Sequence, residues 1–212
     1  MITQLPHDLQ HHVWDLYTGG LHDRYTARHQ RAVAAAASLL AQVDLLCEDA
    51  PSRDYLLDWM AHMLRFPHAK PTRALVLIGE DRDGIDQLLI LLSRLAPTLQ
   101  TREPRRDVFG HRNLEMVRLI VLDNPARLHL PSLKSLVSNA ALLSGDRVLP
   151  SYHRVVLVIP ELRASLANNR RLVNIHCTRG GSEEALRDVL LDTLAMKALR
   201  QLLIDRPVPE HF

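Results

Sequence analysis

Two glycines, Gly79 and Gly84, are separated by four residues and directly follow the apolar run Ala74–Ile78. This is the spacing of a phosphate-binding loop, in which backbone amides between a strand and a helix surround phosphate groups. The next two positions of such a loop are Lys, which neutralises the β- and γ-phosphates, and Ser or Thr, which ligates magnesium. This chain has Ile85 and Asp86 at those positions.

The loop itself is acidic, because it contains Glu80, Asp81 and Asp83. A triphosphate bound there would face these carboxylates, and like charges about 5 Å apart repel by roughly 1 kcal/mol even in water. We therefore predict a vestigial loop that keeps its geometry but has lost its phosphate chemistry, so that the protein uses no nucleotide cofactor.

A second acidic position, Asp123, follows another apolar run, Val117–Leu122. The carboxyl ends of parallel strands meet at one edge of a sheet, so Asp123 is expected near the loop. Oxygen ligands suit magnesium or manganese. One hypothesis is therefore a divalent-metal-dependent enzyme whose acidic cluster is Glu80, Asp81, Asp83, Asp86 and Asp123. No general base or substrate pocket can be named for it.

The elements that would position these residues alternate between strand and helix. Short apolar runs typical of buried parallel strands lie at 74–78, 117–122, 155–159 and 172–175, and helical periodicity lies at 85–95, 131–143 and 162–167. This alternation predicts an α/β fold with a parallel sheet.

Helices are expected at both ends of this core. The pattern predicts a first helix that stops at Thr18-Gly19-Gly20, a long helix over 22–47, and a third helix capped by Ser52. Ser182 is the expected cap of the last helix. We divide the chain into an N-terminal helical region (1–50), an α/β core (51–180) and a C-terminal helix with its tail (181–212).

Composition narrows the class of protein further. The chain has 26 basic and 24 acidic residues, so its net charge of +2 gives little field for non-specific binding of nucleic acid. Two cysteines are too few for a disulfide scaffold or a cysteine zinc site. No apolar run reaches the roughly 18 residues of a membrane span, and we see no secretory signal. We expect a cytoplasmic protein, the host cytoplasm if a phage encodes it.

The order of these segments resembles the phage- and plasmid-type superfamily 3 helicases, roughly over residues 14–178. The resemblance begins with Trp14–Gly19 and continues with Tyr55–Leu64, Lys70-Pro71 and the strand that ends at Gly79. It extends through segments that resemble the Walker B strand, the helix after it, the third signature strand and a closing arginine pair: Leu119–Asp123, Leu133–Leu136, Val155–Ile159 and Arg170-Arg171.

The resemblance implies an AAA+-like P-loop NTPase core that hydrolyses ATP in a ring and moves along single-stranded DNA. Carried over to this chain, it places Ile85 at the Walker lysine and Asp86 at the hydroxyl. Asp123 keeps the metal-side carboxylate, but Asn124 replaces the second acid, and Ile159-Pro160 stands where a polar sensor belongs. Catalytic residues are therefore predicted to be absent.

Basic residues remain as candidates for binding. In the related helicases, arginines in the position of Arg170 and Arg171 stabilise charge on a neighbouring subunit's nucleotide, and a basic turn contacts DNA. Here that turn is Ser144–Arg147, so Arg147 and the nearby Lys134 are the nucleic-acid candidates, and Arg170 and Arg171 are the interaction candidates.

Three hypotheses about function follow. The first is a non-catalytic accessory protein, encoded by a phage or mobile element, that binds a replication protein or other host machinery, with self-association open. The second is a nucleic-acid-binding module that keeps the DNA-facing surface of a helicase. The third is the metal-dependent enzyme. A membrane partner is not expected.

Overall fold

The computed structural model describes residues 7–103, 108, 114–125, 130–138, 141–144, 147–178 and 189–210, with backbone only over residues 7–26, 130, 132, 142–144, 147 and 149. Its centre is a five-stranded sheet in the order β2-β3-β6-β1-β7, and every neighbouring pair is parallel. The strands are β1 (Ala74–Ile78), β2 (Thr98–Thr101), β3 (Leu119–Asp123), β6 (Arg154–Ile159) and β7 (Leu172–His176). The predicted α/β fold with a parallel sheet is confirmed.

Strand β1 lies inside the sheet because its residues are apolar on both faces. Leu75 and Leu77 belong to one hydrophobic core, and Val76 and Ile78 belong to the core on the opposite face. All five residues of β1 are buried. A strand with two buried faces requires helices on both sides of the sheet.

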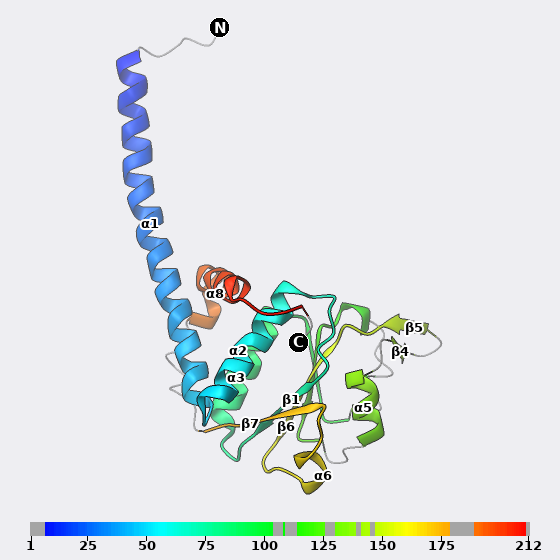
Figure 1. Cartoon of the computed structure of the whole chain (residues 1–212). Helices are drawn as coiled ribbons and strands as arrows, with labels where there is room; N and C mark the ends of the chain where they lie inside the picture. Colours follow the sequence, from blue (N-terminus) through cyan, green and yellow to red (C-terminus); the bar gives the residue numbers. More distant parts are fainter. Residues whose placement is uncertain are drawn as a thin grey trace.

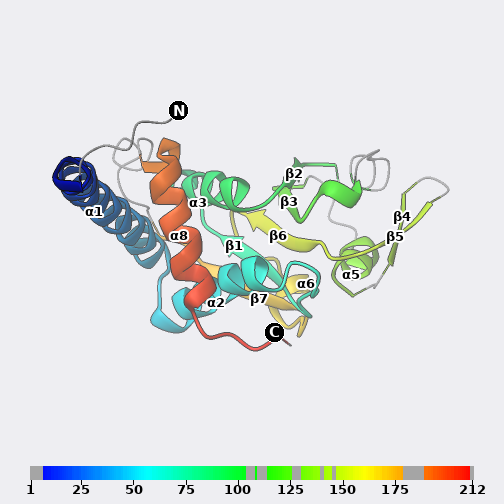
Figure 2. The same cartoon turned by 90° about the horizontal axis from the view of Figure 1, so that it is seen from above.

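One face of the sheet is covered by the helices α1 (His7–Leu46), α2 (Ala50–Arg65), α3 (Arg82–Leu95) and α8 (Thr193–Asp205). The other face is covered by α5 (Leu130–Ser138), α6 (Ala164–Ala167) and the short 3-10 helix η1 (Leu114–Met116). Figures 1 and 2 show this division, with α1 and α8 on the opposite side of the molecule from α5. The N-terminal part of α1 extends away from the α/β body (Figure 1).

A separate two-stranded hairpin, β4 (Ala141–Ser144) with β5 (Arg147–Pro150), lies beside α5 at the edge of the molecule (Figure 2). The sequence pattern predicted helix through residue 143, and this prediction is wrong. Helix α5 ends at Ser138, and Leu142 and Leu143 pair instead with Leu149 and Val148 of the returning strand. A short apolar run fits either state, and here pairing with β5 decides it.

Other boundaries also differ from the pattern. Helix α1 is continuous through Gly19-Gly20, so the predicted break there is wrong. Each glycine costs only about 1 kcal/mol relative to alanine, and the alanine-rich segment that follows favours helix. Helix α2 is capped by Asp49, whose carboxylate accepts from Ser52 N at 2.7 Å, and Ser52 is not the cap. The expected cap Ser182 lies outside the described residues. Strand β2 was not predicted.

The ends of the chain share the core of the sheet. Leu39 and Val43 of α1 and Leu199 and Leu203 of α8 belong to the same hydrophobic cluster as the sheet residues. The predicted division of the chain into three regions, with boundaries at residues 50 and 180, stays a prediction. No helix of the described residues is long and apolar enough to cross a membrane.

Candidate functional site

The loop after β1 is shorter than the glycine spacing predicts. Helix α3 begins at Arg82, so Asp83 and Gly84 already lie in its first turn, and only Gly79, Glu80 and Asp81 connect strand to helix. The side chain of Asp81 caps the helix by accepting from Asp83 N at 3.1 Å. The prediction that the loop keeps the geometry of a phosphate loop is therefore wrong, because a carboxylate now occupies the helix N-terminus where a phosphate would bind.

The two positions after Gly84 take structural roles. Ile85, at the Walker lysine position, is fully buried and packs in the core between α3 and the sheet. Asp86, at the hydroxyl position, has a side chain 52% exposed and pairs with Arg82 one turn earlier. Neither residue can supply the cation or the hydroxyl that a bound triphosphate needs.

Arg82 is the centre of this site. Its guanidinium donates to Asp123 Oδ1 at 2.8 Å and to Asp86 Oδ1 at 2.8 Å. Gln100 Nε2 donates to the second oxygen of Asp123 at 3.1 Å, and Arg102 lies 3.9 Å from that oxygen. The Walker B-like carboxylate is thus engaged on both oxygens by side chains of its own chain. We call Arg82, Asp86, Gln100 and Asp123 the Arg82 cluster.

Burial and charge set the protonation of this cluster. The Asp123 side chain is only 8% exposed. Burial alone would raise the pKa of Asp123, but the hydrogen bonds from Arg82 and Gln100 and the positive charges of Arg82 and Arg102 lower it below its usual value. Burial likewise opposes the charge of Arg82, while its two carboxylate partners raise its pKa. Both groups are therefore charged at neutral pH.

The end of β6, the strand next to Asp123 on one side, carries no polar side chain for a metal-bound water. Ile159, at the end of β6, is fully buried, and its carbonyl accepts from Gly79 N at 3.2 Å. Asn124 adopts a left-handed backbone with φ 43° and donates its amide to Val158 O at 2.8 Å. Its side chain is exposed and takes no part in the hydrogen bonds of the Arg82 cluster.

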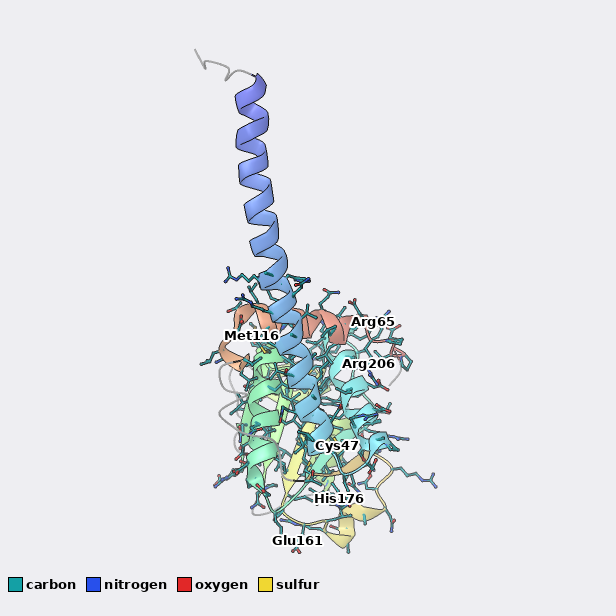
Figure 3. All side chains as sticks on the ribbon, turned by 90° about the vertical axis from the view of Figure 1, so that its left-hand side faces the viewer. Cys47, Arg65, Met116, Glu161, His176 and Arg206 are labelled. Atoms are coloured by element: carbon teal, nitrogen blue, oxygen red, sulfur yellow. The ribbon has the colours of Figure 1, made fainter. Side chains whose placement is uncertain are left out.

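Position 79 requires glycine because the backbone of Cys177 approaches it closely. A Cβ atom at this position would lie 3.0 Å from Cys177 O and 3.3 Å from the side chain of Ile85. Cys177 in turn forms an isolated antiparallel bridge with Cys47 at the end of α1, and both thiols are free. Figure 3 shows Cys47 and His176 at the same end of the molecule, where Glu48 N donates to His176 O at 3.1 Å.

The acidic residues do not form a metal centre. No three His, Cys, Asp or Glu side chains of the described residues come together in a way that could hold a metal ion. The hypothesis of converging carboxylates is wrong because the members have other partners: Asp81 caps α3, and Asp86 and Asp123 share Arg82.

The residues that the sequence predicted to bind a partner or nucleic acid lie away from the Arg82 cluster. Arg170 and Arg171 are exposed in the turn before β7, and Lys134 is exposed on α5. Lys134 and Arg171 line the same hollow, so the structure brings these two predictions together. Arg147 begins strand β5, and its side chain is not among those described. Nothing in the sequence pattern pointed to Arg82 or Gln100, although Arg82 and Asp86 have the i,i+4 spacing of a helical ion pair.

Comparisons with known proteins agree with this architecture. Two structures of the A form of the apo C-terminal region of NrS-1 superpose with TM-scores of 0.63 and 0.61, at 15% and 16% identity. Both comparisons cover 84% of this chain and less than half of the other, 45% and 46%. The chain therefore shares its fold with the C-terminal region of NrS-1.

Three further findings define what this similarity supports. The X-ray structure of JCV helicase aligns over 84% of this chain and 55% of the other at 13% identity, but its TM-score of 0.48 is too low to support an argument. No family model and no curated protein matches the sequence. At such low identities the similarity to NrS-1 shows the fold alone.

Proposed function

We propose that this helicase-like domain is a pseudo-ATPase, which keeps the fold, has given up ATP turnover, and acts by binding. The observation that carries the proposal is the Arg82 cluster. In an ATPase of this fold class, the carboxylate at the position of Asp123 faces magnesium and its water. Here a guanidinium of the same chain holds that carboxylate at 2.8 Å.

Three further features support the same proposal. The Walker lysine position holds the fully buried Ile85. The carboxylate of Asp81 caps the start of α3 by accepting from the amide of Asp83, so a phosphate would have to displace a carboxylate. Glu80, Asp81 and Asp83 add negative charge around that helix start, which opposes a triphosphate. Together with the Arg82–Asp123 pair, these features leave phosphoryl-transfer catalysis without its cation, its amide cradle and its free metal ligand.

The proposed activity is binding to a replication protein or to other host machinery, by a protein that a phage or mobile element encodes. Arg170 and Arg171 support this role, because both are exposed and neither forms an ion pair with the described residues. An arginine pair held at the start of β7 recognises carboxylates or phosphates bidentately. A second copy of the chain is an alternative partner for this pair.

An ATP-turnover assay tests the loss of catalysis. Purified protein with magnesium and ATP is expected to release no phosphate above the no-enzyme background, and Asp123→Ala is expected to change nothing. Magnesium-dependent turnover that Asp123→Ala abolishes would contradict the proposal.

A second candidate function is a nucleic-acid-binding module. The β4–β5 hairpin favours it, since it lies at the edge of the molecule beside α5 and begins its second strand with Arg147. Phosphate contacts release counterions, so binding to DNA would weaken steeply between about 50 and 200 mM salt. Binding of single-stranded DNA with such a salt slope, lost in Arg147→Ala and Lys134→Ala, would favour this function over a protein partner.

A further inference from the structure

A groove runs along α5 on the face of the sheet opposite α1 and α8. It consists of two adjoining hollows of about 510 Å³ each, which share Val137 and Arg171. Helix α5 forms one wall. The loop 70–73 before β1 and the turn 169–172 before β7 form the other. We call this feature the α5 groove.

The rim of the α5 groove is strongly basic. Four exposed cations lie on it: Arg73, Lys134, Arg170 and Arg171. Within the described part of the chain none of the four forms an ion pair, and no acidic side chain lines either hollow. The whole chain is nearly neutral, with a net charge of +2. The excess of positive charge on the rim is therefore a local feature of this surface. The rim therefore has unsatisfied capacity for carboxylate or phosphate groups.

A fifth cation, Lys70, is held at the end of the groove. Its Nζ donates to Ser151 Oγ at 2.6 Å, and burial lowers the pKa of Lys70 to about 8. Lys70 is therefore mostly charged at pH 7 and adds to the positive potential. An anionic ligand in the groove would raise the pKa of Lys70 back toward its usual value, so the charged lysine favours binding.

The apolar part of the lining between these cations is aliphatic. It consists of Pro71, Pro131, Leu133, Val137 and Leu172, of which only Pro131 is exposed, and the neutral polar residues Thr72, Ser138 and Asn169 complete the lining. No aromatic side chain lines either hollow among the described residues. Single-stranded nucleic acid binds mainly through aromatic stacking of its bases beside a basic track. An aliphatic floor with an arginine rim instead matches a peptide that carries both carboxylates and aliphatic side chains.

We propose that the α5 groove binds an acidic peptide segment of a partner protein, with Arg170 and Arg171 on its carboxylates and the aliphatic floor on its apolar side chains. This inference rests on the proposed function, because it names the chemistry of the partner in that binding role. In this role Arg170 and Arg171 bind a peptide and need no nucleotide.

The test uses the full chain and fluorescence anisotropy with three labelled probes. These are a peptide of three Asp-Glu-Leu repeats, a peptide of three Lys-Lys-Leu repeats, and a twelve-nucleotide oligothymidine. The groove variant is Arg170→Glu with Arg171→Glu. The matched control is Arg94→Glu with Lys197→Glu, which makes the same change in net charge at exposed positions on α3 and α8. Circular dichroism and thermal melting verify that each variant folds.

The acidic peptide is expected to bind, and the groove variant is expected to weaken that binding by at least about tenfold, since charge-assisted hydrogen bonds are lost. The control variant should stay within about twofold of the unchanged protein, and the basic peptide should not bind. Equal weakening in both variants would overturn the proposal by showing a general charge effect. Tighter binding of the oligonucleotide through Arg170 and Arg171, or no binding of the acidic peptide, would overturn it too.

The same preparations separate this proposal from the proposed loss of catalysis. Peptide binding together with ATP turnover would refute the pseudo-ATPase and leave the α5 groove standing. Absence of both would refute the α5 groove and leave the pseudo-ATPase standing.

Discussion

Replacing Arg82 by alanine tests the physical account of the site. The substitution leaves Asp123 buried at 8% side-chain exposure, with Gln100 as its remaining hydrogen-bond donor and Arg102 at 3.9 Å. A hydrogen bond to a charged group contributes about 1.5–3 kcal/mol, and the loss is greater when a charge is left buried. We therefore expect Arg82→Ala to lower the free energy of unfolding by about 2–3 kcal/mol.

The second ion pair of Arg82, with Asp86, supplies the control. Asp86 is half-exposed and lies four residues after Arg82, so this pair is an ordinary surface ion pair of the helix. Such pairs contribute about 0.3–0.5 kcal/mol. Asp86→Ala is therefore expected to cost several times less than Arg82→Ala. Urea denaturation followed by circular dichroism at pH 7 measures both values.

The pH dependence gives the comparison a second readout. The pKa of Asp123 is lowered in the folded protein, so its contribution to stability is present above the unfolded pKa and is lost as pH falls through the folded pKa. The difference between the unchanged protein and Arg82→Ala should therefore shrink in acid, below about pH 4. Equal costs for Arg82→Ala and Asp86→Ala, or a difference that grows in acid, would refute the reasoning.

Three further predictions concern other parts of the chain. Ile85→Lys is expected to cost more than about 3 kcal/mol in urea denaturation without creating ATP turnover, since it places a charge in the core. Arg154→Met is expected to cost about 2–4 kcal/mol in the same assay, because the buried Arg154 donates to the carbonyls of residues 62, 66 and 69. Burial first, then nearby charge, raises the pKa values of Cys47 and Cys177 to about 11 and about 12. Stability should then fall as pH rises above about 9, and the double alanine variant should lose that fall; a pH-independent unfolding free energy in the unchanged protein would contradict this prediction.

The sequence predicted the sheet well because each buried strand is a continuous apolar run. The boundaries predicted for β1 agree with the structure residue for residue, and Asp123 ends β3 as expected. Strand β2 escaped prediction because Thr98–Thr101 is an edge strand with polar residues and partial exposure. An edge strand is fixed by its pairing with β3 and needs no apolar pattern of its own.

The sequence singled out Asp86 and Asp123 of the Arg82 cluster, but it did not indicate Arg82 or Gln100 or the geometry that joins them. Glycine spacing suggested an open loop, but spacing does not reveal that Asp81 caps a helix starting at Arg82. The role of Arg82 depends on Asp123, which lies 41 residues later, and such a contact appears only when β1 and β3 enter one sheet. The α5 groove was missed for the same reason, because three separate segments of the chain line it.

The most direct test of the central claim is a thermal melt with and without millimolar magnesium-ATP. A ligand at 100 times its dissociation constant stabilises the native state by about 2.7 kcal/mol, which shifts the melting temperature of a chain of this size by several degrees. Because Arg82 holds Asp123 and Ile85 replaces the lysine, we predict no shift. A shift of several degrees with magnesium-ATP that Asp123→Asn removes would contradict the account.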